Sequence, residues 1–208
     1  MVEIKKMPFK ERYEGMLTNM KVLESWTIPI VKERLGDSKV DELKSIWQEQ
    51  SEPIPDDAFY EEKWDIAYRN WMRNWISAYD FVRNELGECG KETFIRRGAD
   101  AWKKATSGPA LHVLNFVRAI SPQTAFRTFG KQIAYTWQSL DDYSISEFTG
   151  KRMVLTVSHC KGMDVKGCET VCKIGCKKLL PLFLDEQFKV KATFEPAGKS
   201  CTITLTPN

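Results

Sequence analysis

The sequence lacks the short motifs that mark several large enzyme classes. It contains no phosphate-binding glycine loop, no His-Glu-x-x-His zinc helix and no Gly-x-Ser-x-Gly elbow, and each of these motifs supplies groups that its chemistry needs. A glycine fingerprint with strand–helix alternation is absent as well, which argues against a parallel dinucleotide-binding sheet. Nucleotide hydrolysis, zincin proteolysis and serine-hydrolase chemistry are therefore poorly supported.

The chain also lacks a strong charge of either sign and a long hydrophobic run. Its 31 basic and 28 acidic residues give a formal net charge of +3, so the composition makes no general case for nucleic acid or a membrane as partner, and any such case must be local. The first ten residues alternate charged and apolar side chains and form neither a signal peptide nor a spanning helix. We expect a cytoplasmic protein that binds neither nucleic acid nor a membrane.

What the chain does contain is typical of an ordered globular protein. With 208 residues, of which 42% are hydrophobic and 12% aromatic, we expect one domain, or one core with an added helical layer. The pattern is helical from Pro8 to about Leu140. β-rich runs then flank two turns, at 149–150 and 196–198, with a helix between the two pairs. The order predicts an α+β fold: a helical N-terminal layer at 1–89, then an α+β unit at 90–208 whose β-β-α-β-β order forms a four-stranded antiparallel sheet.

One helix, predicted from about Pro55 to Leu86, carries an aromatic stripe. Residues spaced by three or four place these side chains on one face that must be buried: Trp64, Tyr68, Trp71, Trp75, Tyr79 and Val82. Such a stripe is more often a helix-packing seam than the lining of a ligand site. On the alternative interpretation, an apolar small molecule binds in a pocket with Trp71, Trp75, Phe126 and Phe129 as candidate lining residues.

The six cysteines are the main functional clue, because four of them lie between Cys160 and Cys176. In a reducing cytosol, clustered thiols more often hold a metal or do redox chemistry than form disulfides. Packing as small buried residues is the alternative. Seven basic residues against two acidic ones at 151–178 would stabilise thiolates. The candidate metal ligands are Cys160, Cys168, Cys172, Cys176 and Cys201.

Geometry limits how these thiols can share a metal. On a regular helix Cys168, Cys172 and Cys176 drift by only about 40° per step and share a face, but the outer two are roughly 12 Å apart along the axis. A single zinc ion could therefore take only a neighbouring pair, completed by Cys160 or His159 and by Cys201. The spacing matches neither a zinc ribbon nor a ferredoxin, so zinc and an iron–sulfur cluster both stay open.

We expect different roles for the two histidines. His159 directly precedes Cys160 and could serve as a proton shuttle or hydrogen-bond donor. His112 lies on an apolar helix at 111–120, and we expect it to be a satisfied core histidine.

The C-terminal layout resembles a known family. Its parts are Ala119-Ile120-Ser121-Pro122, a helix to Leu140, strands ending at His159-Cys160, a small-residue-rich helix, and then Glu195 and Cys201. Over about 90–208 this resembles the vinyl-4-reductase-type small-molecule-binding domain and the related L-2-amino-thiazoline-4-carboxylic acid hydrolase-like proteins.

The resemblance implies an α+β fold related to haem–nitric-oxide-binding and TRAPP-subunit domains. It also implies a homodimer, an apolar ligand pocket between helices and sheet, and metal ligands near Cys160 and Cys201. The three helix cysteines exceed the family pattern, and Gly162 stands in place of a longer glycine-rich segment.

Three functional hypotheses follow. The first is a cysteine-ligated metal- or iron–sulfur-binding protein with an apolar small-molecule pocket and a sensor or accessory role. The second is a thiol- or metal-dependent hydrolase of a small cyclic substrate, with Cys160 beside His159 as candidate catalytic residues. The third is a dimeric interaction module with structural cysteines and no cofactor.

Overall fold

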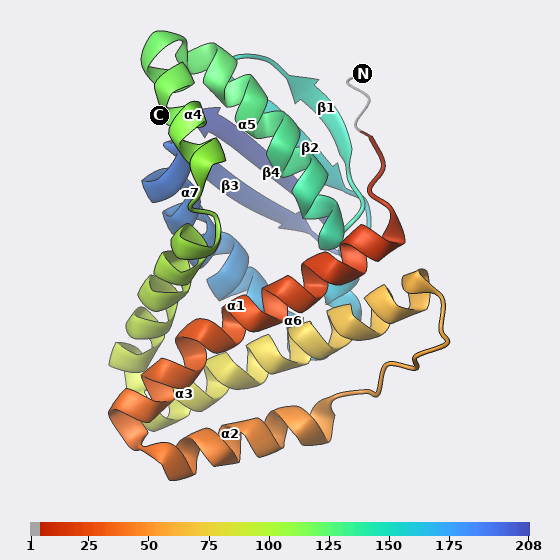
Figure 1. Ribbon diagram of the computed structural model, residues 1–208, viewed down its shortest axis with the longest axis vertical. Coiled ribbons are helices and arrows are strands. Elements are labelled where there is room, and N and C mark those ends of the chain that lie inside the picture. The colour runs from red at the N-terminus through yellow and green to blue at the C-terminus, as the bar shows by residue number, and fades with distance from the viewer. Residues whose placement is uncertain (1–4) are drawn as a thin grey trace.

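Helices form most of the N-terminal two thirds of the chain and the sheet lies in the C-terminal third (Figure 1), as seen in a computed structural model that describes residues 5–208. The helices are α1 (Phe9–Leu35), α2 (Asp37–Gln50), α3 (Tyr60–Ala105), α4 (Pro109–Ile120), α5 (Pro122–Thr136), α6 (Cys168–Thr170) and α7 (Leu180–Phe188). The strands are β1 (Ser144–Phe148), β2 (Met153–Val157), β3 (Val190–Ala197) and β4 (Ser200–Pro207). Short 3-10 turns at Trp137–Ser139 and Lys161–Asp164 and a π-helix at Val171–Leu179 complete the fold. Among these residues no helix is both long and apolar enough to cross a membrane.

The four strands form one antiparallel sheet in the order β1-β2-β4-β3. Each predicted hairpin is present, and β4 pairs with β2 at the centre of the sheet. Alternate residues of β2 are buried at Met153, Leu155 and Val157, because successive strand side chains point to opposite faces. The predicted α+β fold with a β-β-α-β-β C-terminal half is confirmed.

The helical layer is built on α3, which packs against α1 and α2 (Figure 1). All six stripe positions predicted from the sequence are buried, each with at most 9% of its surface exposed. Phe94 is fully buried and meets the rings of Trp26, Trp75 and Tyr79 edge-on. The stripe is thus a packing seam in the core between these three helices.

The long helix α3 consists of two helical stretches joined by a kink. The first begins at Tyr60 rather than near Pro55, and its helical geometry ends at Gly87, as the sequence indicated. Gly87 has φ 62° and ψ −146°, a conformation that is accessible essentially to glycine alone. The second stretch continues from the kink to Ala105.

A second core lies between the sheet and α5 and α7. Phe126 and Phe129 from α5, Phe183 from α7 and Leu155 and Leu205 from the sheet are all buried in it. In Figure 1, α5 crosses one face of the sheet, and α7 leads directly into β3. The polar positions of α5 alternate with this buried face at helical spacing, as expected for a helix covered on one side.

Helix α4 departs from expectation, because none of its residues is buried. His112, predicted to be a core histidine, is exposed, and that prediction is wrong. The apolar side chains of Val113, Phe116 and Ile120 are 62%, 68% and 70% exposed. The helix leaves large apolar side chains in solvent, so apolar composition did not locate the core here.

The cysteine-bearing helix is irregular. Between Cys168 and Phe188 the helical run is continuous, but its middle, Val171–Leu179, is a π-helix. Pro181 lacks an N–H and therefore removes one bond from the regular ladder in this same run. π-helical turns are rare and frequently occur at functional sites.

Candidate functional site

Four of the six thiols gather where the helical layer meets the sheet. Cys160 follows β2, Cys172 and Cys176 lie on the π-helix, and Cys201 belongs to β4. The pKa of Cys176 is raised first by burial and then by the proximity of Cys172, Cys160 and Cys201. Cys201 pairs with Val157 at the end of β2, which brings it to the same edge as Cys160.

Tyr68 of α3 reaches this thiol group from the helical side. A Cβ atom added to Gly162 would lie 3.2 Å from the Tyr68 hydroxyl oxygen and 3.5 Å from Cys160 Sγ. The hydroxyl and the thiol therefore both lie next to Gly162, where a larger residue would crowd them. The pKa of Tyr68 is raised by burial and then by Cys160 and Asp141. We call the junction cluster the set Tyr68, Asp141, Cys160, Cys172, Cys176 and Cys201.

Asp141 is the member of the cluster that the sequence did not indicate. Its Oδ2 accepts the Lys161 backbone N–H at 2.9 Å, and its Oδ1 accepts the Asp142 N–H at 2.9 Å. Burial raises the pKa of Asp141 to about 6, against the lowering effect of these two N–H groups and of the Cys160 thiol. A carboxyl that titrates near neutral pH in a buried setting is typical of functional sites.

Three thiols of the cluster, those of Cys160, Cys176 and Cys201, have raised pKa values. Burial, followed by the charge of Asp141, raises the pKa of Cys160 to about 11, and burial also raises the pKa of Cys201. The lysines of this basic segment do not reverse the effect, since desolvation disfavours the thiolate more strongly than their charges favour it. The expectation that nearby lysines would stabilise thiolates is therefore wrong for these two thiols.

Cys176 is a partly exposed residue whose thiol is enclosed by protein. Protein surrounds this thiol closely enough that burial is the largest cause of its raised pKa. Cys160, Cys172 and Cys201 are partly exposed as well.

The two remaining cysteines lie apart from these four. Cys168 is buried in the helical core, where its Sγ donates to Met163 Sδ at 3.5 Å. Cys89 is exposed on α3. Of the five predicted metal ligands, the structure brings together four and assigns Cys168 to packing.

His159 does not support Cys160. Its Nε2 pairs with Asp164 Oδ2 at 2.8 Å, and both side chains are half exposed. Lys199 contacts the other oxygen of Asp164 at 3.0 Å, and His159 and Lys199 together lower the pKa of Asp164. The histidine belongs to a surface ion-pair group, whereas Cys160 faces the interior.

The thiols are not arranged as a closed metal site. Within residues 5–208, no three His, Cys, Asp or Glu side chains lie where one metal ion could bind them. Sulfur donors suit zinc and iron–sulfur clusters, so the donor chemistry fits a soft metal while the spacing does not.

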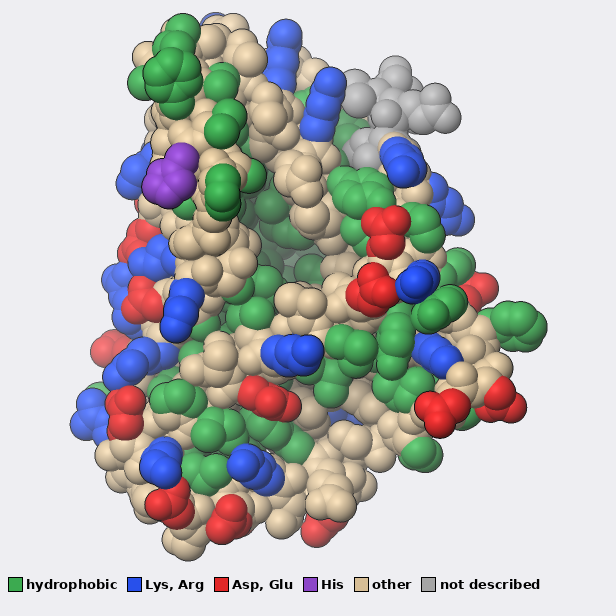
Figure 2. Space-filling model, viewed as in Figure 1, with side chains coloured by type: hydrophobic (Ala, Val, Ile, Leu, Met, Phe, Trp, Pro, Cys, Tyr) green, Lys and Arg blue, Asp and Glu red, His purple; other side chains and the backbone are tan. Residues whose placement is uncertain are grey.

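The candidate pocket residues fall into two different cores. Trp71 and Trp75 are buried in the helical core, and Phe126 and Phe129 are buried in the core under the sheet. Figure 2 shows a hollow on this face, in the region between α1 and α5, with hydrophobic side chains at its bottom. The apolar small-molecule ligand stays a prediction.

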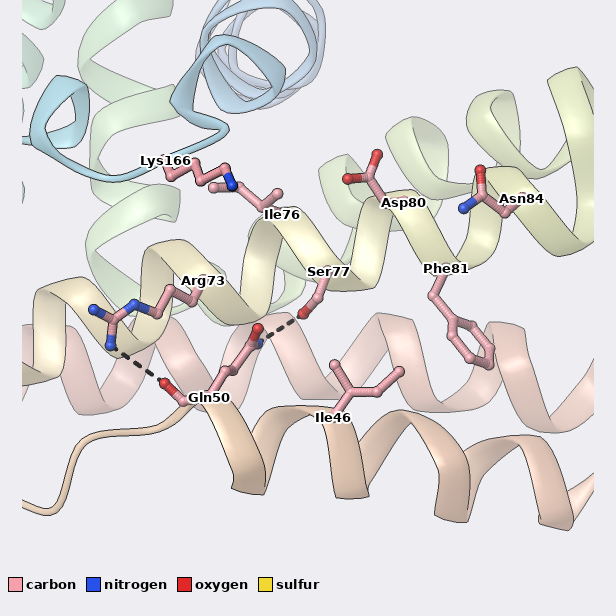
Figure 3. Close-up of a pocket in the computed structure, with 9 residues that line it drawn as sticks. All are labelled: Ile46, Gln50, Arg73, Ile76, Ser77, Asp80, Phe81, Asn84 and Lys166. Carbon is pink, nitrogen blue, oxygen red and sulfur yellow. Dashed lines mark hydrogen bonds between the residues drawn. The ribbon is translucent and has the colours of Figure 1, made fainter.

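A polar groove of about 360 Å³ runs between α2 and α3 (Figure 3). Its polar groups already bind one another: Gln50 Nε2 donates to Ser77 Oγ at 2.9 Å, and Arg73 Nη1 donates to the Gln50 carbonyl at 3.2 Å. Arg73 also pairs with Glu52 at 2.7 Å, and the two arginines beside Glu52 lower its pKa to about 2. The groove contains none of the residues predicted to be functional, and its polar groups have little free bonding capacity.

Comparison with known proteins does not place the chain in a family. No protein-family model matches it, and no curated protein matches it. Among solved structures, a mutant of the Fe(II) unliganded H-NOX protein from K. algicida matches with a TM-score of 0.35 and 9% identity, covering 90% of this chain and 95% of that one. The unmutated protein matches with a TM-score of 0.30, 12% identity and the same coverage. The resemblance to vinyl-4-reductase-type domains stays a prediction.

Proposed function

We propose that this chain is a non-catalytic binding protein whose junction cluster takes up a thiophilic metal ion through its cysteine thiols. The observation that supports the proposal is the proximity of four cysteines, from three separate segments of the chain, where the helical layer meets the sheet. A packing role alone does not require thiols from β2, β4 and the π-helix to meet. A sensor or accessory role agrees with this placement.

Binding must be coupled to proton release. Cysteine ligates metals as the thiolate, and the pKa values of Cys160, Cys176 and Cys201 are all raised. Each thiol recruited by a metal therefore loses a proton that it holds at neutral pH. Because the spacing in the described residues is open, uptake also requires the thiols to move closer together.

The hydrolase hypothesis has less support. A thiol nucleophile needs a lowered pKa or an adjacent base, whereas the pKa of Cys160 is raised to about 11 and His159 is engaged with Asp164. Asp141 lies beside Cys160, but its negative charge raises the thiol pKa further. The geometry therefore favours a buried, protonated thiol over an activated one.

The proposal is tested by metal analysis of protein purified without oxygen. We expect bound zinc, or iron with acid-labile sulfide and a visible chromophore, and the spectrum separates the two. Cys176→Ser should lose most of the metal because it removes the central thiol of the cluster. Cys89→Ser is the matched control, since Cys89 is exposed and remote from the cluster, and it should retain the wild-type content.

A second measurement uses the proton coupling. In a titration of metal-free protein with Zn²⁺, the apparent affinity should increase steeply between pH 6 and pH 8, since about one proton leaves with each thiol that binds. Wild-type protein that is metal-free and takes up no Zn²⁺, or a Cys176→Ser variant with unchanged content, would refute the proposal.

A further inference from the structure

Helix α4 carries an apolar face that the rest of the chain leaves uncovered. Pro109, Val113, Phe116 and Ile120 are all exposed, and their spacing of four, three and four residues places them in one stripe along the helix. Figure 2 shows hydrophobic side chains gathered at the upper left, where Figure 1 places α4. A contiguous exposed apolar patch usually marks an interaction site.

The outward orientation of this stripe is held by specific contacts. On the inner side of α4, Arg118 Nη2 donates to the Phe188 carbonyl at 2.7 Å, and Leu114 packs against the core under the sheet. Partial burial also lowers the pKa of Arg118. The helix thus turns Leu114 and Arg118 toward the rest of the chain and leaves Phe116 and Ile120 exposed.

The segment that carries the stripe, with its neighbours in the chain, is positively charged. Residues 101–140 include five basic residues and no acidic one. Lys103 is paired with Asp100 and Glu186, but Lys104, Arg127 and Lys131 are exposed and form no ion pair within residues 5–208. Helix α5, which carries the last two, packs beside α4.

We propose that this α4 surface, formed by Val113, Phe116 and Ile120 with Lys104, Arg127 and Lys131, binds the anionic surface of a lipid bilayer. An amphipathic helix with apolar side chains on one face and basic residues around it binds at the boundary of headgroups and acyl chains. Each nearby Lys or Arg adds attraction to anionic lipid. The formal net charge of +3 for the whole chain does not indicate this local group of basic residues.

A second copy of the chain fits the surface less well. A symmetric contact would place the same basic residues of both copies opposite each other, and like charges across an interface disfavour association. The stripe is also narrow, with three large side chains, whereas a stable dimer buries about 800 Å² on each partner. Neither argument applies to an anionic lipid surface, because its charge is opposite to that of the basic residues and because binding to it does not require a protein interface of that area.

Vesicle sedimentation tests the proposal. The full chain should sediment with phosphatidylcholine vesicles that also contain phosphatidylserine, and not with phosphatidylcholine vesicles alone, and added salt should weaken binding. Phe116→Ser should weaken it about tenfold, the change expected when a phenylalanine loses its burial in the bilayer. Arg127→Gln and Lys131→Gln should each weaken it about fivefold.

Phe59→Ser is the matched control. Phe59 is 86% exposed and directly precedes α3, at the opposite side of the molecule in Figure 1, so its replacement should leave vesicle binding unchanged. Absence of wild-type binding, or equal loss in Phe59→Ser and Phe116→Ser, would overturn the proposal. A concentration-dependent dimer that Phe116→Ser dissociates, without vesicle binding, would overturn it in favour of a second copy.

Discussion

Helices α3 and α4 carry similar apolar stripes and have opposite surroundings. The aromatic face of α3 is buried along its whole length by α1, α2 and the π-helix. The face of α4 that carries Phe116 and Ile120 is largely exposed, although these residues are as hydrophobic as those of α3. Periodicity therefore locates an apolar face correctly, but whether that face is covered by the same chain depends on tertiary packing.

The largest change in the free energy of unfolding is expected for a substitution in the buried aromatic core around α3. Phe94→Ala removes a fully buried ring that contacts three other aromatic rings, and it should lower the free energy of unfolding by about 3 to 5 kcal/mol. Urea denaturation measures the change. Phe59→Ala, at an exposed phenylalanine, should change it by less than about 0.5 kcal/mol, and equal losses in both variants would contradict the assignment of the core.

The junction cluster should make the free energy of unfolding depend on pH through Asp141. The pKa of Asp141 is about 6 in the folded protein and about 3.9 in an unfolded chain. The folded state therefore binds the proton more tightly, and this contribution is fully present below the unfolded pKa and lost as pH rises through the folded one. Between about pH 3 and pH 7 the free energy of unfolding should fall by about 3 kcal/mol from this group, most of it between about pH 4 and pH 6.

Other carboxyl groups titrate in the same range, so the test is a comparison of denaturation profiles. Asp141→Asn should lack this fall, and Asp41→Asn, which replaces an exposed aspartate, should keep the wild-type profile. If the Asp141→Asn profile parallels that of the wild type, the carboxyl is not desolvated as described.

A substitution at Gly87, the kink within α3, should have an intermediate effect on the free energy of unfolding. Gly87→Ala places a side chain at φ 62° and ψ −146° and should lower the free energy of unfolding by about 1 to 3 kcal/mol. Gly108→Ala is the matched control, because Gly108 is extended and an added Cβ would meet no atom within 4 Å. A straightened α3 that tolerates Gly87→Ala would show that the kink is not required.

The smallest effect is expected on the uncovered face. Phe116→Ser should change the free energy of unfolding by less than about 0.5 kcal/mol, since the ring is 68% exposed. Thermal unfolding in the absence of vesicles checks this. A loss above 1 kcal/mol would mean that α4 is covered within the chain, and the contrast with α3 would disappear.

The sequence allowed the fold to be predicted because its signals were local. The hairpin at Thr149-Gly150 and the alternation in β2 are set by residues adjacent in the chain. The stripe from Trp64 to Val82 has a period that a single helix explains. The end of the first stretch of α3 at Gly87 was predicted as well, because a glycine after the last periodic residue indicates a helix end.

The candidate site could be predicted only in part. The clustered cysteines indicated Cys160, Cys168, Cys172, Cys176 and Cys201 as candidate ligands. The structure places all but Cys168 near one another, although no three ligands in the described residues lie close enough to bind one metal ion. Asp141 could not be found, because its burial and its pKa result from contacts with Lys161 that only the tertiary structure creates. The π-helix was missed for the same reason, since no propensity rule distinguishes it from an α-helix at Val171–Leu179.

The path of α3 has a consequence for how the molecule unfolds. Phe94 belongs to the core of the helical layer, Ala99 belongs to the core under the sheet, and Trp102 contacts both. One uninterrupted segment therefore contributes to both cores, and neither can open fully while the other stays intact. We expect a single cooperative unit, in which the slowest-exchanging amides of α1 and of β4 report the same global opening free energy.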